Sequence, residues 1–218
     1  SQATIENAQA QDASFFGAKL ESVSLFQSNL SRSNFENANF NNSYVGSAIF
    51  EQVYMVNANL DGVTGENASF RDSTLESVLM RSGWFENADF SSTSLYRADL
   101  SGSGFVNADF TNADLEDANL RNADFSGANM TNVTLTNADL SGAVWTNGQT
   151  CLAGSFGFCK TSGGANPNPN PFPAVSLTST SLSKFIAPIE GCSRQQPQLW
   201  HQHRSYLCPQ LRFRCLCS

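Results

Sequence analysis

The fold is decided by residues 108–127, which read Ala-Asp-Phe-Thr-Asn, Ala-Asp-Leu-Glu-Asp, Ala-Asn-Leu-Arg-Asn and Ala-Asp-Phe-Ser-Gly. The same five-residue phase holds from Ile5 to Trp145. Apart from Ala10 and Gly65, every residue in that range whose number is divisible by five is large and apolar. The residue two positions earlier is always small or β-branched, and most often Ala. Because no insertion breaks the phase, this part of the chain is a true internal repeat.

A period of five predicts a composite backbone geometry, because neither the helix period of 3.6 nor the strand period of 2 divides it. Three extended residues would point in, out and in, so the small and the large side chain are both inward. The other two residues would turn a corner. Positions 7, 12, 17 and onward are mostly Asn and Gly, which tolerate turn geometry. Short edges joined by corners wind the chain into an all-β solenoid.

The number of edges in one coil follows from the central residues, because like side chains stack best on like. From Phe50 onward, central residues four pentapeptides apart are identical more often than those three pentapeptides apart. We therefore expect four pentapeptides per coil and about seven coils. Gly65 reduces the inward volume and is expected to loosen the ladder between Val45 and Phe85. The clearest predicted ladder is Phe50, Phe70, Phe90 and Phe110.

The pattern Ala-(Asp/Asn)-(Leu/Phe)-x-x over residues 3–147 resembles the pentapeptide-repeat family. This resemblance implies a right-handed quadrilateral β-helix, with which the count of four edges agrees. The family has no common enzymatic activity and implies no cofactor. Its best-known members mimic duplex DNA and protect topoisomerases from inhibitors, and many others occur in cyanobacteria and in the thylakoid lumen.

Composition divides the chain into three predicted parts. We assign residues 1–150 to the repeat solenoid, 151–164 to a disulfide-closed C-terminal cap, and 165–218 to a Pro-rich linker and an irregular tail with cysteines. All seven prolines fall after residue 166. Up to residue 165 there are seven Lys or Arg against 18 Asp or Glu, and after it five against one.

Several function classes are excluded by the sequence. The formal net charge of −7 argues against a generic basic nucleic-acid-binding surface. No apolar run is long enough to span a membrane. The repeat contains no histidine, and a filled solenoid offers its carboxylates no cleft, so we expect no catalysis. The possible metal ligands of the tail match no zinc spacing, so we expect no metal site among Cys192, His201, His203, Cys208, Cys215 and Cys217. The disulfide pairing of the four tail cysteines stays open.

Large apolar residues occupy several outward positions where their neighbours are polar. Tyr44 and Trp84 should share one side, two coils apart, with Thr64 between them. Exposed aromatic clusters usually mark a contact surface. Scattered single apolar residues, or cover by the tail, are the alternative. The predicted partner-binding residues are Phe26, Tyr44, Ile49, Tyr54, Leu79 and Trp84.

A second hypothesis uses the outward acidic residues, since a rod bearing regularly spaced carboxylates could imitate DNA phosphates. The competing explanation is that Asp and Asn simply suit this position. The residues fall on different sides, which dilutes any single acidic stripe. In this hypothesis the protein inhibits or protects a topoisomerase (gyrase) in the cytoplasm. The candidate DNA-mimicking residues are Asp89, Asp99, Asp109, Asp114, Asp124 and Asp139.

Cys151 and Cys159 bracket a nine-residue segment directly after the last coil. We expect a disulfide that pins a cap over the open end, with two reduced thiols as the alternative. A disulfide implies an oxidising compartment, namely periplasm, thylakoid lumen or secretion. A chain that begins with Ser1 fits a processed precursor, as would a trimmed fragment. The partner is expected to be another protein, or a second copy docked end to end or side by side, and not nucleic acid.

Overall fold

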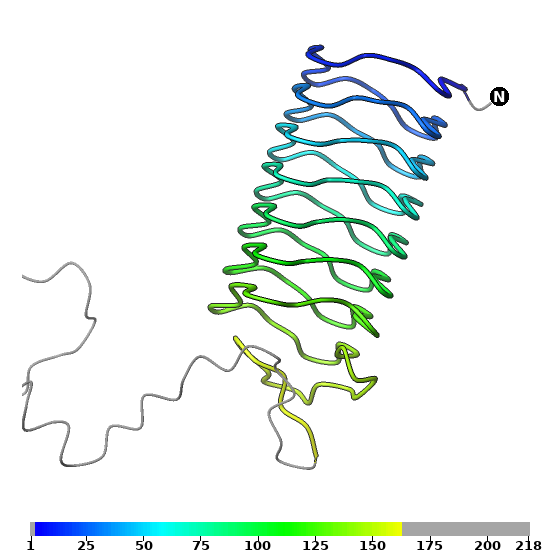
Figure 1. The fold of residues 1–218 in the computed structure, drawn as a ribbon. Coiled ribbons are helices and arrows are strands. Elements are labelled where there is room, and N and C mark those ends of the chain that lie inside the picture. Colours follow the sequence, from blue (N-terminus) through cyan, green and yellow to red (C-terminus); the bar gives the residue numbers. More distant parts are fainter. Residues whose placement is uncertain (1–2, 163–218) are drawn as a thin grey trace, which may run out of the picture. The chain divides into compact units, whose positions relative to one another are not determined.

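The computed structural model describes residues 3–162, and everything below concerns that part of the chain. The predicted Pro-rich linker and cysteine-containing tail, residues 165–218, lie outside it. Residues 3–146 wind into successive coils stacked along one axis (Figure 1). The last described residues, 147–162, leave the repeat and return against the final coil.

Each coil consists of four five-residue edges. Parallel bridges join each outward residue to the one four pentapeptides later without interruption, from Thr4 with Ser24 to Asp124 with Val144. Between residues 3 and 162 there is no helix and no strand longer than its single bridging residue. The expected three-residue strands are thus reduced to isolated bridges, because a corner follows each edge after only three residues.

Backbone hydrogen bonds connect each edge to both neighbouring coils. Phe90 N donates to the carbonyl of Asp109 at 2.7 Å, and Asp109 N donates back to the carbonyl of Ala88 at 2.9 Å. This alternation repeats along the solenoid. Each interior coil therefore satisfies its neighbours' backbone groups.

The corners have the backbone conformation that their composition predicts. Every position from Asn7 to Gly142 in steps of five has a positive φ, as at Asn87 with 57°. Asn, Asp and Gly tolerate this left-handed region better than other residues do. The turn around Asn87 is closed by a hydrogen bond from Ala88 N to the carbonyl of Phe85.

The aromatic ladders form as predicted. Rings of Phe50, Phe70, Phe90 and Phe110 stack at 5.0–5.1 Å, nearly parallel. The adjacent ladder contains Phe85, Phe105 and Phe125, with Trp145 edge-on at its end. Rings of the two ladders meet edge to face, a favoured arrangement. From Leu25 onward the central side chains are buried.

One expectation about the core is wrong. Gly65 does not loosen the ladder, because the Phe85 ring and Val45 already fill the space where a Cβ at Gly65 would lie. The first coil is also less buried than the later ones. Ile5 is exposed, and Phe15, whose ring stacks on Phe35 at 4.7 Å, is only partly buried. No described coil lies beyond the first to cover these side chains.

The buried hydroxyl residues at the small inward position have a structural role. Each donates to the carbonyl of a central residue in the preceding coil, as Ser73 does to Phe50 at 2.8 Å. A buried polar group that is hydrogen-bonded costs little, so Ser and Thr can replace Ala here. The same contact is made by Ser28, Ser33, Ser43, Thr93 and Ser103.

Candidate partner-binding side

The bridge register sorts the outward residues into four columns, one on each side of the solenoid. The column that contains Tyr44 runs through Thr64 and Trp84 to Gly104. We call this column, together with Phe26, Glu66 and Glu86 at its following corner, the Trp84 side. The predicted neighbours Tyr44, Thr64 and Trp84 are thus confirmed as vertical neighbours.

The other predicted apolar residues do not join this side. Ile49, Tyr54 and Leu79 bridge residues of the three remaining columns, one in each. Ile49 and Tyr54 are exposed singly, and Leu79 is half-buried. Of the six predicted partner-binding residues, the register thus brings Phe26, Tyr44 and Trp84 to one side, where Phe26 stacks on Tyr44 and Trp84 stands two coils from Tyr44.

Tyr44 is held in place by three contacts. Its ring stacks on Phe26, with 5.6 Å between centroids. It leans over Gly46, where an added Cβ would lie 2.6 Å from the phenolic oxygen. Its hydroxyl donates to Glu66 Oε1 at 2.7 Å. This hydrogen bond, with burial and the carboxylate charges of Glu66 and Glu6, raises the pKa of Tyr44 above 10.0.

Trp84 lies flat against the backbone of the next coil. A Cβ at Gly104 would lie 2.7 Å from Trp84 Cε3, so the indole occupies the space that any side chain at this position would need. Even so, 48% of the surface of Trp84 remains exposed. The indole is therefore in contact with the protein on the Gly104 side, and about half of the residue is available to a partner.

Sequence reasoning missed Gly46, Glu66 and Gly104, which complete the Trp84 side. Gly46 stands two residues after Tyr44, and Gly104 follows Trp84 by one full coil. A glycine at one of these two separations from an outward aromatic residue is a usable signal once the coil length is known. Glu66 had no such signal, because glutamate is common at the corners.

The six candidate DNA-mimicking carboxylates are arranged around the solenoid. Asp89 and Asp109 share one column, Asp99 and Asp139 share another, and Asp114 and Asp124 stand in one each. All six accept a hydrogen bond from the backbone N–H two residues further on, as Asp109 does from Thr111 at 2.8 Å. Asn residues at equivalent positions make the same contact. These aspartates therefore have a local turn-stabilising role.

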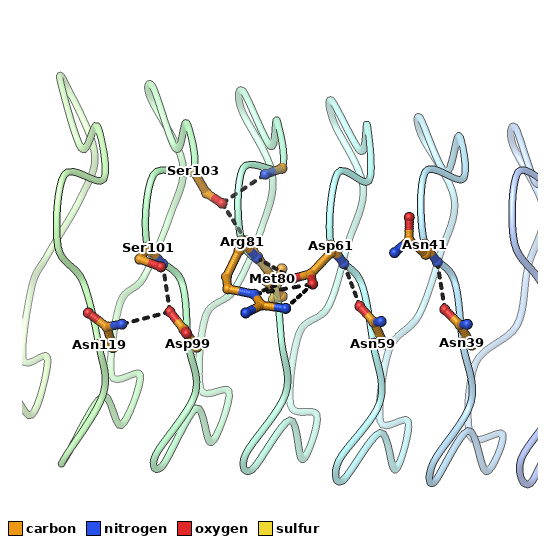
Figure 2. A network of polar contacts seen from close by, with 11 residues as sticks. Asn39, Asn41, Asn59, Asp61, Met80, Arg81, Asp99, Ser101, Ser103 and Asn119 are labelled. Carbon is orange, nitrogen blue, oxygen red and sulfur yellow. Dashed lines mark hydrogen bonds and ion pairs between the residues drawn. The ribbon is translucent and has the colours of Figure 1, made fainter.

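Figure 2 shows this contact on the column of Asn39 and Asn59, where each amide oxygen accepts from the next corner. Arg81 forms a multiply hydrogen-bonded ion pair with Asp61 one coil away. Burial alone would raise the pKa of Asp61, but the hydrogen bonds and charge of Arg81 outweigh it and lower that pKa below 3.8.

Further ion pairs neutralise part of the acidic surface. Asp89 faces Arg71 at 3.5 Å, and Asp139 faces Arg121 at 2.9 Å. Burial would raise the pKa of Asp139, but hydrogen bonds from Ser141 and Arg121 lower it overall. Two of the six candidate phosphate mimics thus have a cation beside them.

The segment after the last coil turns back over it. Cys151 and Cys159 form a disulfide, and both are buried. Cys151 N donates to Ala143, Gly142 N donates to Cys151, and Leu140 N donates to Ser155. Antiparallel bridges join Asp139 with Phe156 and Val144 with Thr150, in contrast to the parallel bridges of the repeat. Three apolar side chains that sequence reasoning did not single out are exposed here: Leu152, Phe156 and Phe158.

Within residues 3–162, no cluster of three or more His, Cys, Asp or Glu side chains could hold a metal ion. The same part of the chain has no helix long and apolar enough to cross a bilayer. The tail cysteines and histidines considered above lie outside this range.

The register and the filled core define a class, a solenoid of stacked five-residue edges. The family model for pentapeptide repeats matches residues 13–52 and 104–142, with eight copies. The chain belongs to the pentapeptide-repeat family. A comparison with curated protein sequences finds no significant match.

Several solved structures are similar to this chain at low identity. HetL, a pentapeptide repeat protein involved in heterocyst differentiation regulation in Nostoc sp. strain PCC 7120, is 21% identical over 68% of this chain and 92% of its own, with a TM-score of 0.29. A trypsin-treated variant of QnrB1, a plasmid-mediated fluoroquinolone resistance protein, is 18% identical over 65% of this chain and 73% of its own, with a TM-score of 0.49. A pentapeptide repeat protein from the Arabidopsis thaliana thylakoid lumen is 20% identical over 58% of this chain and 83% of its own, with a TM-score of 0.21.

Proposed function

We propose that this chain is a non-enzymatic interaction protein, a right-handed quadrilateral β-helix of about seven coils that presents its sides to a protein partner or to a second copy. The observation that supports this proposal most is the Trp84 side, which carries the stacked pair of Phe26 and Tyr44 and, two coils from Tyr44, the exposed Trp84. The stacked coils hold these side chains on a rigid backbone. Binding then costs little conformational entropy.

Capture of partners from the native source tests this proposal. The wild-type chain is compared with the Tyr44→Ser/Trp84→Ser double variant, and bound proteins are cross-linked and identified by mass spectrometry. The matched control is Tyr54→Ser, which removes an exposed aromatic side chain from another side. Light scattering at rising concentration measures self-association in parallel. We expect the double variant alone to lose the partner or the self-association, and unchanged behaviour would overturn the proposal.

We further propose that the protein works outside the cytoplasm, in the periplasm, the thylakoid lumen or the extracellular space. The Cys151–Cys159 disulfide supports this location, because such bonds persist in oxidising compartments. Mass spectrometry of protein from its source, alkylated without reduction, tests it. An intact bond gives a mass lower by two hydrogens and no alkylation at either cysteine. Complete alkylation of both thiols would argue for the cytoplasm.

The alternative is a DNA-mimicking inhibitor or protector of a topoisomerase such as gyrase. The outward aspartates favour it, but their distribution over all four columns and their contacts with backbone N–H groups weaken it. A gyrase supercoiling assay with the purified chain decides directly. Inhibition, or protection from a gyrase inhibitor, that is lost in an Asp89→Asn/Asp109→Asn variant would support this alternative against the first proposal.

A further inference from the structure

The partner proposed above must match the charge of the surface that it meets. We propose that the Trp84 side binds an arginine side chain carried by an extended segment of that partner. The inference rests on the proposed function and specifies the chemistry of the partner.

The first support is the posture of Trp84. The indole is pressed against Gly104, and 48% of the surface of Trp84 is still exposed. A flat aromatic ring with one free face attracts cations, and tryptophan does so most strongly of the aromatic residues. Since the backbone beneath it is bridged to the coils on both sides, the ring is preorganised for such a contact.

The second support is uncompensated negative charge at the following corner. Glu66 uses one carboxylate oxygen to accept from Tyr44, while its other oxygen, Oε2, is buried without a hydrogen-bond partner. Glu86 follows at the same corner one coil later, two residues after Trp84. In residues 3–162 every ion pair joins an Arg to an Asp, so neither Glu66 nor Glu86 forms an ion pair there.

The two features together favour arginine over lysine. A guanidinium is planar, so it can stack on the indole and still direct several N–H donors at carboxylates. An ammonium has no flat face to stack. An arginine above Trp84 would have its charge balanced by Glu86, two residues further along the chain, and the carboxylate of Glu66 would add to the negative charge of this side. The segment that carries it would be extended, to lie along a nearly flat side.

Titration of the full-length chain with short peptides tests the inference. The probe is the blocked pentapeptide Gly-Arg-Gly-Arg-Gly, and its control is the same peptide with citrulline, which is neutral and nearly the same shape. Binding is followed by the indole N–H signal of Trp84 in nitrogen-proton correlation spectra, assigned with Trp84→Phe. We expect saturable binding that is about tenfold tighter than that of the citrulline peptide and weaker at higher salt.

Variants locate the binding site. Trp84→Ser should abolish binding, followed by fluorescence anisotropy of a labelled peptide, and Glu86→Gln and Glu66→Gln should each weaken it several-fold. The matched controls are Tyr54→Ser and Glu116→Gln, an aromatic residue and a corner glutamate away from this side, and these should bind as the wild type does. Circular dichroism confirms that each variant is folded.

Two results would overturn the inference. One is equal affinity for the arginine and citrulline peptides, and the other is binding that survives in Trp84→Ser. Its failure is separable from that of the proposed function. If partner capture depends on Trp84 but not on Glu66, Glu86 or arginine, the contact side stands and the arginine inference falls.

Discussion

Tyr44 donates its phenolic hydrogen to Glu66 across one coil, with 2.7 Å between the two oxygens. The folded protein thereby favours the protonated phenol and raises the pKa of Tyr44 above 10.0. The stabilising contribution of this group is complete below pH 10.0 and is lost as the pH rises through the raised pKa of the folded state.

Glu66→Ala should therefore lower the pKa of Tyr44 towards 10.0. The measurement is the ultraviolet absorbance of phenolate during an alkaline titration, with Tyr44→Phe subtracted to isolate this residue. An identical titration curve in Glu66→Ala would show that the hydrogen bond does not hold the proton in solution.

Gly104→Ala should displace the indole of Trp84 without unfolding the protein. The new Cβ would lie 2.7 Å from Trp84 Cε3, and the ring can swing outward because it belongs to a surface side chain. Gly104 is itself buried and the displaced ring loses part of its packing, so the unfolding free energy should fall by about 1 kcal/mol, as for a typical point substitution. Fluorescence quenching by acrylamide should report a more accessible indole. Ser94→Ala, an outward position in another column, is the control and should leave quenching unchanged.

Phe90→Ala should destabilise the solenoid strongly. The ring is fully buried and stacks at 5.0 Å on both Phe70 and Phe110. Removal of a buried Phe side chain costs about 3–5 kcal/mol of unfolding free energy. Urea unfolding followed by circular dichroism measures the loss. Phe16→Ala, which removes an exposed ring, should leave the midpoint nearly unchanged, and equal midpoints for the two variants would contradict the packing.

Arg81→Met should reduce stability at neutral pH more than at acidic pH. The pKa of Asp61 is lowered in the folded state, so its contribution is present above pH 3.8 and is lost as the pH falls through the lowered value. The urea midpoints of the variant and of the wild type should therefore differ at pH 7 and approach each other below pH 3.8. Arg97→Met is the control, since its contact with Asp117 is longer, at 3.6 Å, and should matter less. A constant difference at both pH values would exclude this ion pair as the cause.

Reduction of the Cys151–Cys159 bond should loosen the end of the chain and leave the ladders intact. The loop is short, and the chain-entropy relation gives a stabilisation of about 2–3 kcal/mol for a loop of this size. Hydrogen exchange should accelerate at the Cys151 and Leu152 amides, which are bonded to Ala143 and Lys160. Exchange at Phe90 should stay slow. Uniform acceleration along the chain would mean that the bond stabilises the whole solenoid.

The core of this structure, with its stacked side chains, could be predicted from the sequence because the period of five determines which residues point inward. Phe90 and Phe110 had to stack once four pentapeptides made up one coil, and the structure places their ring centroids 5.0 Å apart. The register also fixed which outward residues share a column. The same register places Ile49, Tyr54 and Leu79 in the three other columns, because sharing the outward position does not mean sharing a side.

The rest could not be predicted, because it depends on side-chain direction within the outward surface. Tyr44 leans along its own edge over Gly46, whereas Trp84 leans into the next coil over Gly104. Nothing in a five-residue pattern distinguishes these two postures. The return of residues 150–156 as antiparallel bridges was equally hidden, because this segment lies outside the repeat.

The unbroken pairing of each outward residue with its counterpart in the next coil restricts how this chain can change in length. Loss or gain of a single amino acid inside the repeat would turn every downstream phenylalanine of the core towards water. Evolution can therefore lengthen or shorten such a molecule only by whole pentapeptides. Any insertion between residues 84 and 104, even of one complete turn, would move Gly104 away from Trp84.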